Sequence, residues 1–318
     1  MNSSISPKDA KGSISSPRSK GGETSVGRRR RPSRSARMTL TYRAIESLRP
    51  TDEQVCSDTI ASSFMGALWS RIARIRIVTR LLIRSVDRDQ SGSPTFVVAR
   101  TRYIDDFLKL QIEDGIKQLV ILGGGYDSRA YRFTRLQQGG VRVIEVDQPY
   151  TQRLKVWTVG KALGSFPKNV VYVPLDFAIE KLAVKLPKAG YQGNLKTLFI
   201  WEGVTMYLTA EAVDQTLAFI ASSGEGSCIV FDYLFESVVD GTSGSLEAEI
   251  LRRSCAAMHE PLLFGIEDNT IERFLSSRGF SLLENVTSKA LKDAYFGGKG
   301  QQRKLFPLQA IACARVRR

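Results

Sequence analysis

The chain has 318 residues, of which 42% are hydrophobic, so it can bury one large core without disulfide or metal staples. Its net charge is +14, but residues 1–38 contribute +8 of this, with ten Lys and Arg residues against Asp9 and Glu23. Much of the basicity therefore belongs to this tail and does not by itself indicate a nucleic-acid-binding domain.

Several functional classes are disfavoured by simple counts. No run of eighteen apolar residues is present, and the first thirty residues lack the apolar stretch of a secretory signal, so we expect neither a membrane span nor secretion. Four cysteines without a CxxC pair, together with His259 as the only histidine, argue against a zinc site and a disulfide framework. We therefore expect a cytoplasmic protein without a metal.

Residues 1–38 are rich in Ser, Gly and Arg and hold almost nothing apolar, which predicts a disordered tail. The interpretation that we prefer is a solvated extension that follows an upstream start codon. A nucleic-acid-binding arm and an organellar transit peptide are the alternatives.

Residues 39–115 have a helical pattern and form the predicted N-terminal helical lid. Apolar residues recur at spacing three and four at Ile72, Ile75, Val78 and Leu82. Another face carries Arg76, Arg80 and Arg84. This predicts a cationic amphipathic helix, ended by the breaker cluster DRDQSGSP. One solvated face is the ordinary interpretation, and contact with anionic lipid or RNA is the alternative.

Short β-branched and aromatic runs begin after Gly115 and are mostly separated by helix-length segments. The five expected strands cover residues 118–123, 141–147, 169–176, 197–203 and 226–234. Strands that alternate with helices predict an α/β fold with a doubly wound parallel sheet over residues 116–318. A helix near 270–277, a strand-like FSLLENV and a last apolar run, LFPLQAIACARV, are expected to close the sheet, with an antiparallel hairpin as one possibility.

Acidic residues terminate the expected strands. They are Glu145, Asp147, Asp176, Glu202 and Asp232. Ligands of doubly wound sheets bind outside the carboxyl ends of the strands, so these side chains are expected to meet in one crevice. A helix N-cap is the alternative role for each acid taken singly.

The segment ILGGGYDSRAYRF follows the first expected strand with glycines that permit a sharp turn beneath a ligand. Gly123 and Gly125 followed by a strand-end acid suit an adenosine ligand, but Ser128 stands where a dinucleotide fingerprint has its third glycine. Asp127 places a negative charge near the position of a pyrophosphate, and no GxxxxGK[ST] motif occurs. A sulfonium cofactor, S-adenosyl-L-methionine, suits an acidic crevice better than NAD or ATP.

Four ordered blocks, LGGGYDSRAYRF, VIEVDQP, VPLDF and WEGVTMYLT, follow ARTRYIDDFL in the sequence. Together they resemble the leucine carboxyl methyltransferase-like family of class I S-adenosylmethionine-dependent methyltransferases, in its bacterial O-methyltransferase branch. The resemblance runs from about residue 43 to the C-terminus. It implies a Rossmann-like sheet with an N-terminal helical lid, and O-methylation of a small molecule or a carboxylate.

The resemblance also implies roles for individual residues. Arg100 would clamp the methionine carboxylate of the cofactor, and Gly123 and Gly125 would pass beneath its methionyl and ribose portion. Asp147 would hold the ribose hydroxyls, with Glu145 as helper or substitute. The cofactor-binding set is completed by Asp176 and Phe177 at the adenine and by Glu202 near the methionine amino or sulfonium end.

The sequence says less about the residues that would contact the methyl acceptor. Tyr207 is the catalytic candidate, with core packing as its alternative role, and His259 is a possible base. Asp127 and Arg129 are expected to fix the glycine turn as a mutual ion pair. The family usually has GAG where this chain has GGG, and Asp-Pro where this chain has Asp58-Thr59, a change that could alter the lid.

Three functions stay open at this point. The first is a small-molecule or carboxylate O-methyltransferase. The second is an RNA-modifying enzyme of the same family, with nucleic acid as its partner, and the third is a non-catalytic adenosine-binding protein. The sequence determines neither the methyl acceptor nor the oligomeric state.

Overall fold

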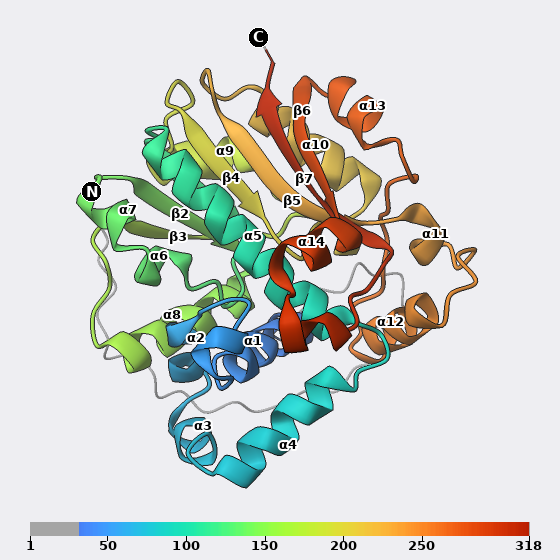
Figure 1. The fold of residues 1–318 in the computed structure, drawn as a ribbon. Coiled ribbons are helices and arrows are strands. Elements are labelled where there is room, and N and C mark those ends of the chain that lie inside the picture. Colours follow the sequence, from blue (N-terminus) through green and yellow to red (C-terminus); the bar gives the residue numbers. More distant parts are fainter. Residues whose placement is uncertain (1–31, 318) are drawn as a thin grey trace, which may run out of the picture. The chain divides into compact units, whose positions relative to one another are not determined.

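The computed structural model describes residues 32–317 and contains a single seven-stranded sheet among them (Figure 1). The strand order is β3-β2-β1-β4-β5-β7-β6. The strands are β1 (Gln118–Leu122), β2 (Arg142–Asp147), β3 (Val170–Pro174), β4 (Thr197–Trp201), β5 (Cys228–Leu234), β6 (Phe280–Thr287) and β7 (Gln309–Val316). Strands β1 to β5 pair in parallel, whereas β7 is antiparallel to both β5 and β6. The predicted doubly wound sheet and its closing hairpin are confirmed.

The α-helices occur before, between and after the strands. Those before the sheet are α1 (Arg34–Glu46), α2 (Thr59–Phe64), α3 (Ala67–Ile72), α4 (Arg76–Asp87) and α5 (Ser93–Glu113). Those between β1 and β5 are α6 (Arg129–Arg132), α7 (Thr134–Gln138), α8 (Pro149–Leu163), α9 (Leu182–Lys188) and α10 (Ala210–Ala221). The remaining ones are α11 (Glu236–Val239), α12 (Leu246–Ala257), α13 (Ile271–Ser276) and α14 (Ser288–Tyr295). Three 3-10 turns are η1 (Thr51–Glu53), η2 (Thr205–Tyr207) and η3 (Gly298–Gln302). Within residues 32–317, no helix combines the length and the apolar composition needed to cross a bilayer.

The N-terminal region differs from the sequence prediction in two places. Residues 34–38, which we assigned to the tail, already belong to α1, because Ser33 caps the helix by accepting a hydrogen bond from the Ala36 amide. The rest of the predicted tail, residues 1–31, lies outside the described residues. The predicted amphipathic helix is also divided. Ile72 is the last residue of α3 and Ile75 is the N-cap of α4, so only Val78 and Leu82 of its apolar residues lie within α4. The division into a lid over 39–115 and an α/β domain over 116–318 stays a prediction.

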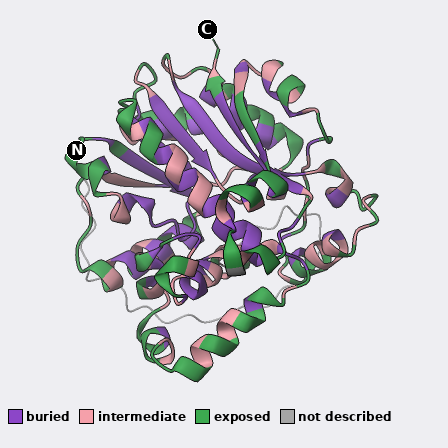
Figure 2. Ribbon diagram, in the orientation of Figure 1, coloured by how far each residue is buried: buried purple, intermediate pink, exposed green. Residues whose placement is uncertain are grey.

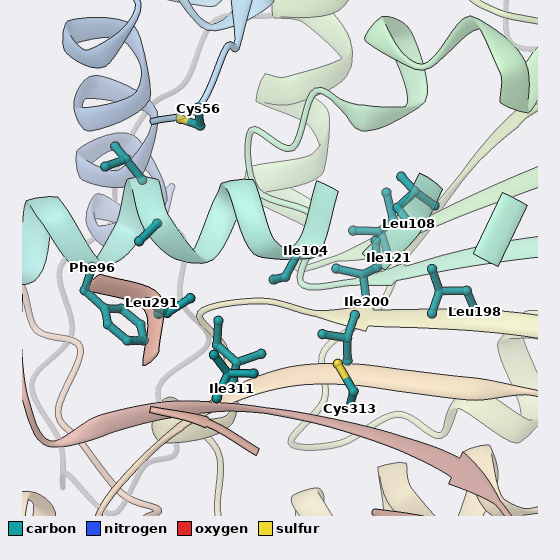
Figure 3. Packing of buried hydrophobic residues seen from close by; sticks show 14 of the residues in the cluster. Cys56, Phe96, Ile104, Leu108, Ile121, Leu198, Ile200, Leu291, Ile311 and Cys313 are labelled. Carbon is teal, nitrogen blue, oxygen red and sulfur yellow. The ribbon is translucent and has the colours of Figure 1, made fainter. Parts of the chain in front are cut away.

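The core lies on both faces of the sheet, whose central strands are buried (Figure 2). On one face α5 packs Phe96, Ile104 and Leu108 toward the strand residues Ile121 and Ile200 (Figure 3). The helices α9, α10 and α13 cover the other face. Parallel strands buried on both sides favour nearly continuous apolar runs, which explains the aliphatic stretches in the sequence.

A buried carboxylate joins the first helix to the C-terminal part of the chain. Glu46, 1% exposed, accepts hydrogen bonds from both terminal nitrogens of Arg303 at 2.9 and 2.8 Å and from Arg49 Nε at 2.9 Å. It also accepts from the Val55 amide at 2.9 Å. Contacts between residues this distant in sequence hold α1 in place, and removing the carboxylate leaves buried guanidinium groups without their partner.

We expect Glu46→Ala to lower the free energy of unfolding by about 3–5 kcal/mol, the usual cost of breaking a buried ion pair. Urea denaturation followed by circular dichroism measures this value. The matched control is Glu113→Ala, which removes an exposed pair with Arg135 at 2.9 Å and should cost less than about 1 kcal/mol. Equal losses in the two variants would contradict a stabilising role for the buried pair.

Candidate functional site

The glycine turn after β1 joins the ends of β1 and β2. The Gly124 amide donates to the Val146 carbonyl at 2.9 Å, and the Gly125 amide donates to Asp147 Oδ2 at 2.5 Å. Gly123 and Gly125 have φ values of +68° and +45°, which disfavour any residue with a Cβ. A Cβ on Gly123 would lie 2.3 Å from Val204 Cγ2. The turn is therefore shaped by glycine both in its backbone and in its close contact with the segment after β4.

Asp147 stands at the end of β2, and within residues 32–317 its carboxylate accepts hydrogen bonds only from backbone amides. Its Oδ2 accepts from Gly125, and its Oδ1 accepts from the Gln148 amide at 2.6 Å. Burial raises the pKa of Asp147 to about 6, although these two amides act in the opposite direction. Each carboxylate oxygen keeps a lone pair for a further donor. The structure thus brings together Asp147 and Gly125, two of the predicted cofactor-binding residues.

Glu145 occupies a different environment from Asp147, although both belong to β2. Its Oε2 lies 2.5 Å from Lys155 Nζ, and each of these two side chains is 1% exposed. The Tyr131 hydroxyl donates to its Oε1 at 3.3 Å. Burial raises the pKa of Glu145, and the nearby Lys155 ammonium partly offsets this. The carboxylate is committed to the protein interior, so Glu145 does not face the same partners as Asp147.

Arg100 links the ends of β4 and β5. Its Nη1 donates to Asp232 Oδ2 at 2.6 Å, and its Nε donates to Glu202 Oε1 at 3.0 Å. The Arg100 side chain is 5% exposed, and its Nη2 forms no hydrogen bond within residues 32–317. Burial alone would lower the pKa of Arg100, but the two carboxylates raise it. The structure places the predicted residues Arg100 and Glu202 in direct contact, with donor capacity left on the guanidinium.

Arg129 holds three carboxylates around one buried guanidinium. Its Nη1 donates to Asp127 Oδ2 at 2.5 Å and to Glu202 Oε2 at 2.6 Å, while its Nε donates to Asp105 Oδ1 at 2.8 Å. The expected ion pair of Asp127 and Arg129 is confirmed. Burial would raise the pKa of Asp127, but the Arg129 charge lowers it. The pKa of Glu202 lies well below its usual range, because Arg129 and Arg100 outweigh its burial.

A third arginine, Arg43, connects the N-terminal helices to the glycine turn. Arg43 Nη1 donates to Asp58 Oδ2 at 2.9 Å, and Arg43 Nη2 donates to the Tyr126 carbonyl at 2.7 Å. Asp58 is fully buried, caps α2 through the Ala61 amide at 3.0 Å, and accepts from the Ser128 hydroxyl at 2.7 Å. The sequence drew attention to Asp58 because the family usually has Asp-Pro where this chain has Asp58-Thr59, and the structure shows that Asp58 is the N-cap of α2. The sequence held no signal for Arg43, because the partner carbonyl is 83 residues away.

Asp176 and Phe177 follow β3, the strand beside β2. The Ala178 amide donates to Asp176 Oδ1 at 3.0 Å, and Asp176 Oδ2 has no hydrogen-bond partner in the described part of the chain. Phe177 is half-buried and packs against the core cluster on the α10 face of the sheet. Both predicted residues therefore stand at the carboxyl edge of the sheet, next to the end of β2.

Tyr207 lies in η2, on the segment that follows Glu202. It packs against the core, and its hydroxyl lies 3.9 Å from Cys255 Sγ. Burial raises the pKa of the Tyr207 phenol, and the neighbouring Cys255 and Glu260 add to this rise. The phenol therefore keeps its proton and can donate a hydrogen bond. His259, the other candidate base, is exposed in a loop with φ +59°.

The acids at the strand ends form two groups. Glu145, Glu202 and Asp232 each contact a Lys or Arg side chain within 3.0 Å. Asp147 and Asp176 form no ion pair with any residue between 32 and 317, and they end neighbouring strands. Charge count alone could not distinguish these groups, because the cationic partners come from other elements. The second group presents free acceptor capacity for a ligand that carries hydroxyl or amino donors.

Comparison with known proteins identifies relatives that match most of this chain. The profile of the family described as leucine carboxyl methyltransferase matches residues 36–221. YktD of Bacillus subtilis (strain 168), provisionally named an S-adenosyl-L-methionine-dependent methyltransferase, is 32% identical over 208 residues, which are 65% of this chain and 67% of YktD. A protein of Mycolicibacterium paratuberculosis with the same provisional name is 30% identical over 274 residues, 81% of this chain and 86% of its own.

Two solved structures share the arrangement of the fold. A provisionally named methyltransferase from Thermobifida fusca YX superposes with a TM-score of 0.56 at 16% identity, covering 91% of this chain and 97% of that one. A DUF574 family protein from Streptomyces avermitilis MA-4680 superposes with a TM-score of 0.53 at 16% identity, covering 75% and 90%. At this identity the likeness concerns the fold alone.

We expect Gly123→Ala to lower the free energy of unfolding by at least about 2 kcal/mol, since it combines a positive φ with overpacking against Val204. The matched control is Gly124→Ala. A Cβ there would lie 3.6 Å from its nearest neighbour, Lys155 Nζ, an ordinary contact, so its effect should stay within about 0.5 kcal/mol. Thermal and urea unfolding measure both variants, and a larger loss at Gly124 than at Gly123 would contradict the turn geometry.

Proposed function

Because the chain belongs to the leucine carboxyl methyltransferase family of S-adenosylmethionine-dependent methyltransferases, we propose that it methylates an oxygen atom of a small molecule or of an exposed carboxylate. The structural observation that supports the cofactor part of the proposal is the pair of strand-end acids, Asp147 and Asp176, which form no ion pair within residues 32–317 and lie beside a glycine turn. The family membership agrees with the resemblance of the sequence motifs, which is thereby confirmed.

We assign the adenosine part of the cofactor to the edge formed by β1, β2 and β3. Asp147 has lone pairs for two hydroxyl donors of a ribose. The hydrogen bond from the Gly125 amide holds its carboxylate in a fixed orientation. Asp176 Oδ2 can accept from an exocyclic amine, and Phe177 offers a half-buried ring for stacking. Glu145 is better suited to supporting the turn, since Lys155 already neutralises it.

We assign the methionyl part to the edge formed by β1, β4 and β5. Arg100 has a free Nη2 for a carboxylate, and Gly203 admits a close approach, since a Cβ there would lie 3.3 Å from the Arg100 guanidinium. Glu202 stays ionised because two guanidinium groups lower its pKa. The arginines of this cluster, Arg100, Arg129 and Arg132, face four carboxylates, those of Asp105, Asp127, Glu202 and Asp232. The excess of negative charge can attract a sulfonium or ammonium group. The donor set thus matches a zwitterionic ligand that carries an additional cation.

S-adenosyl-L-methionine supplies a methyl group that is already activated by its sulfonium sulfur. The protein therefore has to orient the acceptor and to exclude water. Ion-paired acids with a lowered pKa, such as Glu202 and Asp127, are weak bases, and Tyr207 retains its proton. This favours an acceptor that needs no deprotonation at neutral pH, namely a carboxylate. The role of Tyr207 would then be to donate a hydrogen bond or to pack beside the acceptor.

Two other functions give different experimental results. An RNA-modifying enzyme of the same family would transfer methyl groups to nucleic acid, with the basic tail as an electrostatic aid. A non-catalytic adenosine-binding protein would bind the cofactor without any transfer. The family membership favours catalysis, and the charge distribution of the described residues gives no reason to prefer RNA at the strand ends.

The deciding experiment incubates the purified protein and cofactor carrying an isotope-labelled methyl group with a metabolite extract of the host. We expect a labelled small molecule that loses its label as methanol in mild alkali, as a methyl ester does. Alkali-stable label indicates an ether and a hydroxyl acceptor. Ribonuclease-sensitive label would establish the RNA alternative, and cofactor binding without any labelled product would contradict catalysis.

We expect Asp147→Asn to weaken binding of S-adenosylhomocysteine roughly 10–100-fold, because one charged acceptor of the ribose is lost. In the unmodified protein the affinity should be constant above about pH 7 and fall about tenfold per pH unit below the Asp147 pKa of about 6. The sign follows from protonation: a neutral carboxyl group loses acceptor capacity, so acid pH weakens binding. Calorimetric titration between pH 5 and 8 measures both effects.

The variant also serves as the control for the pH profile, since Asn cannot titrate and the pH-dependent loss through pH 6 should disappear. Asp293→Asn, at an exposed position on α14, controls for a change in net charge. Unchanged affinity in Asp147→Asn would contradict the ribose assignment while leaving the enzyme class untouched.

A further inference from the structure

The segment α3–α4 leaves large aliphatic side chains in solvent. We call residues 67–88 the α3–α4 ridge. Its exposed apolar side chains are Leu68 (70% exposed), Ile75 (52%), Ile77 (71%) and Leu81 (58%). The two helices lie away from the sheet, next to α1 and α2, and α4 carries exposed residues along its length (Figure 1 and Figure 2). Aliphatic groups this exposed gain free energy when a partner removes them from water.

The exposed side chains of α4 point away from the protein core. With about 100° between successive residues, Ile77 and Leu81 lie about 100° and 140° around the helix from Arg76. Val86, the buried residue of α4, lies at about 280°, on the opposite side. The inward side already supplies the packing that holds the helix. The outward aliphatic residues are therefore not required by the fold of this chain.

The ridge is strongly cationic. Its exposed arginines are Arg71, Arg74, Arg76, Arg80, Arg84 and Arg88. None of them forms an ion pair with another residue in the described part of the chain. The only acid of the ridge, Asp87, is engaged by Arg49 at 2.5 Å. The partner that complements this surface must therefore be anionic as well as apolar.

We propose that the α3–α4 ridge docks the protein on the surface of a bilayer that contains anionic phospholipid. The arginines contact the phosphate groups, while Ile77 and Leu81 enter the boundary between headgroups and acyl chains. Long arginine side chains reach past the apolar stripe to the headgroups, which suits a helix that lies flat on the interface. At twelve residues, α4 is too short to cross the hydrocarbon layer, for which about 20 residues are needed.

The observations favour lipid over RNA. Proteins bind unpaired RNA by stacking bases on aromatic side chains beside cationic groups. The aromatic residue of the ridge, Trp69, is only 8% exposed, whereas its exposed apolar residues are aliphatic. On RNA these aliphatic side chains would stay in water and gain nothing. On a bilayer both the charge and the apolar surface are used.

The test measures binding of the full chain to vesicles by co-sedimentation. One set contains phosphatidylcholine alone, and the other has about one third phosphatidylglycerol, which gives the surface a negative potential. We expect binding to the anionic vesicles only. The double variant Ile77→Ser and Leu81→Ser should weaken it about tenfold. The triple variant Arg76→Gln, Arg80→Gln and Arg84→Gln should weaken it on the order of a hundredfold.

Matched controls separate the ridge from the rest of the surface. Leu246→Ser with Leu283→Ser removes two exposed aliphatic residues elsewhere, and Lys168→Gln, Lys181→Gln and Lys188→Gln removes three exposed cations elsewhere. Neither control should change vesicle binding by more than about twofold, because salt screens charges that lie more than about 10 Å from the membrane surface. Circular dichroism of all variants verifies folding, and a second pair, Ile77→Gln with Leu81→Gln, replaces any variant that unfolds.

Three results would overturn the proposal. The first is the absence of binding to anionic vesicles. The second is vesicle binding that survives the aliphatic substitutions, which would indicate a purely electrostatic attraction, including one through the basic tail. The third is binding of a single-stranded RNA oligonucleotide in a gel-shift assay that is weakened by the arginine substitutions, while the protein does not bind vesicles.

Discussion

The guanidinium of Arg129 is the interaction on which the site depends. Buried to 1% exposure, it binds a carboxylate from α5, one from the glycine turn and one from the end of β4. Each of these charges would be costly to bury alone, so the cluster is stable only when all members are present. It fixes the glycine turn relative to the helix before the sheet and to the strand beside it. The backbone amides of the turn are thereby set at the edge where the ligand is expected.

The same cluster gives the acids of this edge different chemical roles. Glu202 and Asp127 are held ionised by arginine, whereas burial raises the pKa of Asp147 and backbone amides orient it. The first two are suited to electrostatic attraction of a cation, and Asp147 is suited to accepting hydrogen bonds. Side chains of one chemical type thus act differently because their neighbours differ. This division fits a ligand that is a zwitterion at one end and a polyol at the other.

The N-terminal helices are attached to this arrangement unevenly. Arg43, Glu46 and Asp58 tie α1 and α2 to the glycine turn and to the C-terminal part of the chain through buried charged groups. In α3 and α4, only Trp69 and Val86 are buried, and the outer side is left to aliphatic and basic residues. The part next to the proposed cofactor site is consequently held in a defined position, while the part furthest from the sheet keeps an exposed surface.

The sequence by itself determined the class of fold, because buried parallel strands require uninterrupted aliphatic runs such as QLVILG and TLFIW, and sharp turns require glycines such as Gly123. It also located the acids, since a residue at the end of a strand is recognisable from the run that precedes it. Only the tertiary structure decided which acids are available to a ligand. Lys155 neutralises Glu145, whereas Asp147 accepts hydrogen bonds only from backbone amides among residues 32–317. The physical reason is that strand and turn preferences are local, whereas the charge state and contacts of a buried group depend on partners up to 257 residues away, as between Glu46 and Arg303.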